Sequence, residues 1–273
     1  MAGLIGDWWR AKKHRARVRD AEAEIMARPI GQGAQHGLPA PLVVSLTSFP
    51  KRYATLHLTL RSLLSQSIAP DRVVLWLAKD DVTDLPSEVR ALPGLELAAA
   101  EDFRSYKKII PQLIETPEAF IATADDDVYY SRDWLEGLVA HADAGVVARR
   151  AHLIKMQDGD PLRYDDWDRN IGEPERGKLI FPTGVGGVLY APGVFDPEVT
   201  NIALARELAP FADDVWLYWM HRRAGSVPEK IGGRFRIVEW PDSQVENLRS
   251  INLGQDGNDT AIAAMIRHFG FPS

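Results

Sequence analysis

Three consecutive aspartates, Asp125, Asp126 and Asp127, begin one residue after the apolar segment 119–123. Adjacent carboxylates repel one another, and in a cleft each raises the pKa of its neighbours unless a cation neutralises them. An oxygen-only ligand set suits Mg²⁺ or Mn²⁺ better than Zn²⁺. In an extended segment Asp125 and Asp127 would share one side and Asp126 would point away. The cluster therefore predicts a divalent-metal site, and the alternative is a solvated turn.

A second acidic pair, Asp213 and Asp214, opens an apolar helix. Aspartate is favoured in the first turn of a helix by capping and by the helix dipole, with no chemistry required. Two aspartates are one more than a cap requires, however. The pair therefore also fits a role in which one carboxylate projects into a cleft as a general base.

A glycine-rich segment lies between these two acidic sites and contains Gly184, Gly186 and Gly187. Glycine lets the backbone approach a ligand closely, because it has no side chain. A bulge or bend in a strand explains the same residues equally well. The segment thus predicts either a ligand-facing backbone or a local bend.

The elements that must position these residues form an alternating series. Apolar runs of buried-strand type occupy residues 42–46, 73–78, 95–97, 119–123 and 146–148. Helical stretches follow the first, third and fourth of these runs, which predicts an α/β fold with a mostly parallel, Rossmann-like sheet flanked by helices. Ligands of such sheets bind beyond the carboxyl ends of the strands, and two acidic clusters are expected at such ends, namely Asp80 with Asp81 and the triple aspartate.

Local signals set the expected boundaries of these elements. Pro70 is expected to end the first domain helix, and a later helix is expected from about residue 105. Ser131 is predicted as the N-cap of the helix that contains Trp134, and Gly225 as the residue that closes the helix opened by Asp213. Residues 160–177 are polar and aromatic and predict a long loop.

The chain is expected to divide into a basic N-terminal helix (1–28), a linker (29–41) and a single domain (42–273). The helix carries Trp8 and Trp9 beside a cationic run formed by Arg10, Lys12, Lys13, Arg15, Arg17 and Arg19. This composition fits peripheral contact with an anionic membrane. The alternative is a solvated helix whose tryptophans pack on the domain.

The amino-acid composition excludes several functional classes for this chain. The 273 residues are 45% hydrophobic and 26% charged, which is ordinary globular usage. The absence of cysteine excludes disulfides and thiolate chemistry, and the net charge of -6 argues against a nucleic-acid partner. No long apolar run or signal peptide is visible, so a cytoplasmic location is expected, with peripheral contact at the inner face of the membrane through residues 1–28.

The motifs in their order resemble the GT-A fold glycosyltransferases, in particular the family-2-like and β-1,3-galactosyltransferase-like groups. Residues 121–129 resemble their D-x-D segment, residues 181–187 their glycine-containing strand beneath the donor sugar, and residues 212–216 their E-D-V motif. The resemblance extends over roughly residues 42–225, and the order is more specific than any single motif. It implies a GT-A domain with an N-terminal helical extension.

The resemblance implies roles for the acidic residues. Asp127 matches the aspartate that binds the metal bridging the donor diphosphate, and Asp125, beside Asp126, matches the one that contacts donor hydroxyls and completes the metal site. Asp214 matches the base of inverting members. Asp213 stands where many members carry glutamate, which leaves open which of the two is the base.

The resemblance also implies a nucleotide-binding set. Thr47 and Arg52 match positions near the nucleotide base, Asp80 or Asp81 matches the acid that touches base or ribose, and Lys108 or Lys107 faces the diphosphate. Gly186 and Gly187 would lie beneath the donor sugar. Further candidates are His268 as a metal ligand, and three residues of the acceptor cleft, namely Asn252, Asn258 and Asp259.

The function expected from these features is metal-dependent transfer of a sugar from a nucleotide-sugar donor, with a UDP-sugar favoured, to a saccharide or lipid-linked acceptor, with inversion. Mg²⁺ or Mn²⁺ is the expected cofactor. The alternatives are a nucleotidyltransferase acting on sugar phosphates, a non-catalytic carbohydrate-binding relative and a metal-dependent hydrolase. The segment 47–52 lacks the glycine-rich loop expected of the nucleotidyltransferase.

Overall fold

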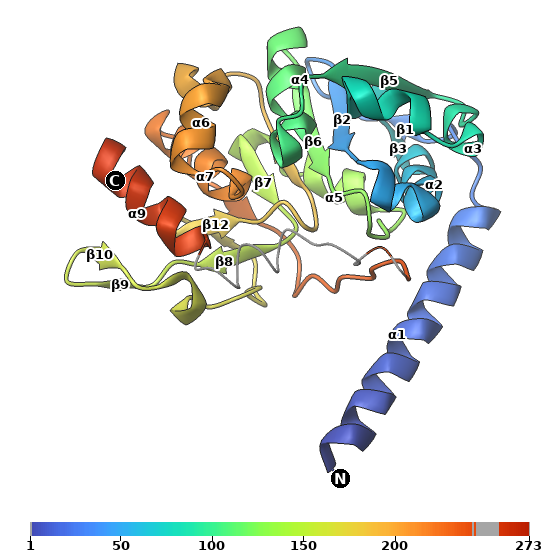
Figure 1. Ribbon diagram of the computed structural model, residues 1–273, viewed down its shortest axis with the longest axis horizontal. Helices are drawn as coiled ribbons and strands as arrows, with labels where there is room; N and C mark the ends of the chain where they lie inside the picture. Colours follow the sequence, from blue (N-terminus) through green and yellow to red (C-terminus); the bar gives the residue numbers. More distant parts are fainter. Residues whose placement is uncertain (1, 242, 244–256, 273) are drawn as a thin grey trace.

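A computed structural model describes residues 2–241, 243 and 257–272. Its centre is an eight-stranded sheet of order β11-β14-β7-β13-β6-β2-β4-β5 (Figure 1). The strands are β2 (Leu42–Thr47), β4 (Arg72–Ala78), β5 (Leu95–Ala100), β6 (Phe120–Ala124), β7 (Val146–Ala148), β11 (Glu175–Arg176), β13 (Val188–Tyr190) and β14 (Glu229–Lys230). All neighbouring pairs are parallel except those that include β11 or β13. The predicted α/β fold with a mostly parallel sheet is confirmed.

Helices cover both faces of this sheet, and the side chains of the strands alternate between them. On β7 and β13, Val147 and Leu189 pack into one core with the helices α2 (Tyr53–Leu64) and α5 (Trp134–Val139). Val146 and Val188 pack into the other core. That core contains residues of α4 (Ile110–Glu115), α6 (Ile202–Leu208), α7 (Asp213–Arg223) and α9 (Gly257–Phe269). Burial on both faces explains why β2, β4 and β6 are almost continuously apolar.

Several predicted boundaries need correction. The first domain helix, α2, ends at Leu64, and the short strand β3 (Ile68–Ala69) intervenes before Pro70. Helix α5 begins at Trp134 with Asp133 at its N-cap, and the hydroxyl of Ser131 donates to the Asp133 carboxylate at 2.6 Å, so Ser131 is not the cap. Gly225 follows α7 with φ 84°, as the prediction of a glycine stop required.

Two predicted segments differ from the expected secondary structure. The helix expected from about residue 105 is a 3-10 turn, η3 (Arg104–Lys108), followed by α4. The loop predicted over 160–177 is interrupted by β10 (Asp160–Pro161), by η5 (Tyr164–Asp166) and by β11. Strand β10 pairs with β9 (Met156–Gln157), and β8 (Ala151–Leu153) pairs with β12 (Ile180–Pro182) in a separate small sheet. The smaller elements are α3 (Ser87–Arg90), η1 (Pro50–Arg52), η2 (Lys79–Asp84), η4 (Ala142–Ala144) and η6 (Pro197–Thr200).

The predicted N-terminal helix is α1 (Ala2–Ala27), whose first half projects from the body of the protein (Figure 1). The predicted linker is packed against that body: β1 (Ala34–Gln35) pairs with β3, and the N–H of Gly31 donates to the carbonyl of Leu64 at 3.0 Å. Of the helices in the described part of the chain, none is long and apolar enough to cross a membrane.

Candidate active site

A cavity of about 850 Å³ opens at the carboxyl ends of β2, β4 and β6. The predicted residues that line it include Thr47, Arg52, Asp81, Lys108, Asp125, Asp126, Asp127, Asp213 and Asp214. The loops that follow adjacent parallel strands meet at the same edge of a sheet, so residues far apart in sequence converge there. The triple aspartate reaches the cavity in this way, and Asp213 and Asp214 line the same cavity from the start of α7.

The acidic segment is held by an arginine and does not have the extended geometry expected. Strand β6 ends at Ala124, and the chain bends at Asp126 and Asp127. The guanidinium of Arg52 forms an ion pair with Asp127 and lies 4.0 Å from Asp126. The prediction that Asp126 points away from its neighbours was therefore wrong, because the bend turns both carboxylates toward one cation.

Asp126 is further fixed by Ser48, whose hydroxyl donates to Oδ2 of Asp126 at 2.5 Å. Burial, together with repulsion from Asp127, raises the pKa of Asp126 to about 7. Thr59 on α2 holds the backbone of the same segment, because its hydroxyl donates to the carbonyl of Asp126 at 3.0 Å. These contacts make the acidic segment a positioned part of the cavity wall.

Lys108 joins the two acidic sites. Its Nζ lies 3.1 Å from Oδ1 of Asp125 and 3.0 Å from Oδ2 of Asp213, and its side chain is only 8% exposed. Burial lowers the pKa of Lys108, but the nearby carboxylates of Asp125, Asp213 and Asp214 outweigh burial and hold the pKa well above its usual value. Lys108 therefore places a permanent positive charge between the two acidic sites.

Asp214 has a different environment from its neighbour. Its Oδ1 accepts a hydrogen bond from the backbone N–H of Gly184 at 2.9 Å. Burial, followed by repulsion from Asp213, raises the pKa of Asp214 to about 7. A carboxylate with a pKa near neutrality can accept a proton from a substrate and release it again. Of the two aspartates, Asp213 is tied to Lys108 and Asp214 has the properties of a base.

The two glycines predicted to lie beneath a donor sugar, Gly186 and Gly187, do not line the cavity. The carbonyl of Gly186 accepts a 2.7 Å hydrogen bond from the indole of Trp134. A Cβ on Gly187 would lie 2.4 Å from the ring of Trp134. The bend that these glycines form therefore makes room for a buried tryptophan, and Gly184 is the glycine of this segment that reaches the cavity.

The remaining predicted residues divide between the cavity and the surface. The hydroxyl of Thr47 donates to the carbonyl of Trp76 at 2.8 Å, which fixes the end of β2 against β4. Asp81 is half-buried at the cavity, and burial raises its pKa. Asp80 is exposed and does not line the cavity, so of the two alternatives Asp81 is the one placed to contact a ligand.

Three candidates near the C-terminus separate in the same way. Asn258 lines the cavity, whereas Asp259 accepts a hydrogen bond from the backbone of Tyr164 at 2.8 Å. His268 is exposed on α9, and its ring stacks edge-on against Phe269 at 4.4 Å. Asn252 lies outside the described residues.

Sequence reasoning missed an aromatic wall of the cavity. Tyr164 and Phe181 line it, with ring centroids 6.1 Å apart, and Phe181 packs against Trp167 at 5.2 Å. His152 completes this wall, and its Nδ1 accepts a hydrogen bond from the backbone of Asn170 at 3.1 Å. These residues come from β8, β12 and the segment predicted as a loop, so no periodic signal pointed to them. Sugar rings and bases both pack well against such aromatic faces.

The lining of the cavity also contains an arginine in an unusual backbone conformation. Arg104 has φ 54°, which is rare for a residue with a side chain. Its guanidinium lies 4.3 Å from the centre of the Phe211 ring, and both residues line the cavity. Residues held in such conformations concentrate at functional sites.

The carboxylates predicted to bind a divalent metal are engaged by protein cations. Asp127 and Asp125 are already paired with Arg52 and Lys108, so the charge that predicted a metal is neutralised by protein cations. Within residues 2–241, 243 and 257–272, no group of three or more histidine, aspartate or glutamate side chains could hold an ion. The described residues therefore do not form a ready divalent-metal site.

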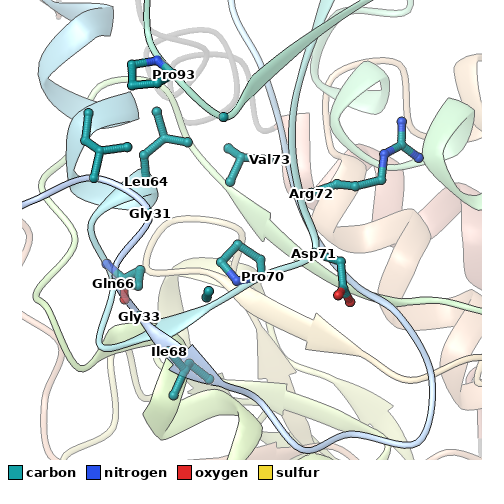
Figure 2. Close-up of a pocket in the computed structure, with 13 residues that line it drawn as sticks. Gly31, Gly33, Leu64, Gln66, Ile68, Pro70, Asp71, Arg72, Val73 and Pro93 are labelled. Carbon is teal, nitrogen blue, oxygen red and sulfur yellow. The ribbon is translucent and has the colours of Figure 1, made fainter.

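A second, smaller cavity of about 130 Å³ lies at the opposite edge of the sheet, where β4 begins. Figure 2 shows Leu64, Pro70, Val73 and Pro93 around it. The carboxylate of Asp71 beside it accepts a hydrogen bond from the backbone of Leu42 at 2.7 Å. The rest of its lining is largely apolar, and its two charged residues are already paired, Asp71 with His36 and Arg72 with Glu96, so the cavity fits a packing gap.

Comparison with known proteins found no matching family model and no similar curated protein. A solved 4-diphosphocytidyl-2C-methyl-D-erythritol synthase is 16% identical over 77% of this chain and 97% of its own, with a TM-score of 0.44. The synthase from Anaerococcus prevotii DSM 20548 is 14% identical over 75% of this chain and 93% of its own, with a TM-score of 0.48. At these values we draw no functional conclusion from either structure.

Proposed function

We propose that this chain is a transferase that uses a nucleotide-activated sugar, and that it moves the sugar from a nucleoside diphosphate to an acceptor hydroxyl. One observation carries the proposal: Nζ of Lys108 lies 3.1 Å from Asp125 and 3.0 Å from Asp213, so the acidic sites of two separate motifs share one cavity. Sugar transfer needs such an arrangement, because charge develops on the leaving group and a proton leaves the acceptor at the same centre.

The leaving diphosphate would be stabilised by protein cations. Arg52 and Lys108 face the cavity and are fixed by the carboxylates beside them, so little reorganisation is needed when negative charge develops. The described carboxylates do not form a ready metal site, and no step of this mechanism is assigned to a metal. The aromatic wall of Tyr164 and Phe181 would pack against a sugar ring or base.

Asp214 is the proposed base. It would take the proton of the acceptor hydroxyl as the acceptor oxygen bonds to the anomeric carbon, while the bond from that carbon to the diphosphate breaks. The Asp214 pKa of about 7 suits this transfer at neutral pH. A single displacement of this kind inverts the anomeric configuration, and a product that retains it would contradict the assignment.

Nucleotidyl transfer onto a sugar phosphate is the second candidate. It is favoured by the cationic side chains of the cavity, because this reaction brings a nucleoside triphosphate and a second phosphate into one site. The cavity is lined by Arg52, Arg104, Lys107, Lys108, Arg150 and Arg169. The synthases compared above are named for a diphosphocytidyl compound, but their likeness to this chain carries no weight for activity.

A product assay tests and separates the two candidates. The protein would be incubated with nucleotide sugars and, separately, with nucleoside triphosphates and sugar 1-phosphates. Release of a nucleoside diphosphate from the first mixture, lost in Asp214→Asn, is the result expected of sugar transfer. If only the second mixture reacts and releases pyrophosphate, nucleotidyl transfer is the activity and sugar transfer is not. If neither product is released, both candidate functions are wrong.

A further inference from the structure

Residues in the second half of the N-terminal helix α1 anchor it to the body of the protein. Val18, Ala21 and Ile25 are buried in a cluster with Leu58 and Trp240. These three residues follow helical spacing, so they form one face of α1. That face packs against the body of the protein, and the opposite face of α1 points away from this contact.

The free half of α1 carries exposed tryptophans. Trp8 is 53% exposed and Trp9 is 49% exposed, which is unusual for the largest apolar side chain. The ammonium of Lys12 lies 5.2 Å from the centres of both rings. Lys12 precedes Ala21 by about two and a half helical turns and therefore points away from the anchoring face. Figure 1 shows this half projecting beyond the body of the protein.

The charge of this half is opposite to that of the protein. Residues 8–19 contain six lysines and arginines and no aspartate or glutamate, whereas the whole chain carries a net charge of -6. Indoles prefer the headgroup region of a bilayer, and a cluster of basic side chains is attracted to anionic lipid. An acidic or neutral surface without an apolar layer would leave both tryptophans in water.

We propose that the free half of α1 binds the surface of an anionic lipid bilayer, with Trp8 and Trp9 in the headgroup region. The anchor of the helix adjoins the candidate active site, since the backbone N–H of Trp240 donates to the carbonyl of Asp127 at 3.0 Å. A bilayer bound to α1 is therefore connected through one tryptophan to the wall of the cavity. Binding of α1 to a bilayer does not depend on which reaction takes place in the cavity.

Vesicle binding by the full chain tests the proposal. The probes are vesicles of phosphatidylcholine alone and of phosphatidylcholine mixed equally with phosphatidylglycerol, at about 0.1 M and about 1 M salt. We expect at least about tenfold stronger partitioning onto the anionic vesicles at low salt, and a similar loss in Lys12→Glu/Lys13→Glu. Trp8→Ala/Trp9→Ala should weaken binding at both salt concentrations, because its contribution is apolar.

Matched controls make the result specific to α1. Arg206→Glu/Arg267→Glu makes the same charge change at exposed positions on α6 and α9 and should leave partitioning unchanged. Circular dichroism confirms that each variant folds. Equal binding to both kinds of vesicle, or equal losses in the α1 and control variants, would overturn the proposal. Failure of all vesicle binding while the full chain is retained by another protein through α1 would overturn it as well.

Discussion

The backbone N–H of Gly184 donates a 2.9 Å hydrogen bond to Oδ1 of Asp214. A Cβ on Gly184 would lie 2.7 Å from Nζ of Lys108 and 3.0 Å from the same carboxylate oxygen. The glycine thus allows three functional groups to meet where any larger residue would separate them. It also leaves the second oxygen of Asp214 available to a substrate hydroxyl, which is the geometry that a base requires.

Replacement of the two aspartates of α7 should have unequal effects. Asp214→Asn removes the proposed base and should lower kcat by roughly 100- to 10,000-fold, a range typical of general bases. Asp213→Asn removes one of the two carboxylates paired with Lys108 and should lower kcat less. Steady-state kinetics of the two variants checks this order, and equal losses would contradict the assignment of Asp214.

The pH dependence of the reaction should follow Asp214. A base acts only when it is deprotonated, and its pKa is raised to about 7 by burial and by Asp213. The value of kcat/KM should therefore fall about tenfold for each pH unit below 7 and level off above it. A profile that is flat between pH 5 and pH 8 would show that another group takes the proton.

Lys108 should be essential to the stability of the site. Lys108→Met leaves Asp125 and Asp213 facing each other without their cation, and such a loss costs about 3–5 kcal/mol of unfolding free energy. The double variant Lys108→Met/Asp213→Asn should recover part of this loss, because it removes one of the stranded charges. Urea unfolding of the single and double variants measures the recovery, and strictly additive losses would contradict the bridging role.

A pair of glycine substitutions tests the role assigned to the bend around Trp134. Gly187→Ala and Gly193→Ala both place a side chain on a residue with φ near +80°, at 87° and 75°. This strain alone costs about 1–2 kcal/mol. The new Cβ at Gly187 also overlaps the Trp134 ring. The new Cβ at Gly193 has no atom within 4 Å. We expect Gly187→Ala to lose at least about 2 kcal/mol more unfolding free energy than Gly193→Ala. Urea unfolding of the two variants measures this difference.

The triple aspartate was predictable because Asp125, Asp126 and Asp127 follow the end of a strand, and parallel strands present their ligands at one edge of the sheet. Asp213 and Asp214 open α7, which follows another helix, so their place in the same cavity was expected from the order of the motifs. The cavity contains both acidic sites. Their orientation was not predictable, since the bend after β6 depends on tertiary contacts such as the ion pair with Arg52.

The glycines show why local patterns are ambiguous. Gly186 and Gly187 have the composition of a ligand-facing strand, but they serve Trp134, which is about fifty residues earlier in the chain. The aromatic wall around Phe181 likewise assembles from segments that have no periodicity of their own. Such contacts exist only in the folded chain, and a single sequence does not display them.

A buried histidine away from the cavity should control stability in mild acid. Burial, with a smaller effect of Arg222, lowers the pKa of His221 to about 3. The unfolded chain takes up this proton near pH 6.5 and the folded chain does not, so the free energy of unfolding falls as the pH decreases from 6.5 toward 3. Relative to His221→Phe, the wild type should lose roughly 2 kcal/mol between pH 7 and pH 5. Parallel stability curves of the two proteins would contradict the prediction.

Nucleotide binding by calorimetry tests the central claim most directly. UDP, GDP and CDP would be titrated into the wild type, Arg52→Gln and the surface control Arg206→Gln, each with Mn²⁺ and with chelator so that binding is seen under either condition. Circular dichroism verifies folding. The account predicts that one nucleoside diphosphate binds the wild type and the control, and that Arg52→Gln binds it at least about tenfold more weakly because a charge-assisted contact is lost. Absence of binding under both conditions, or unchanged binding by Arg52→Gln, would contradict it.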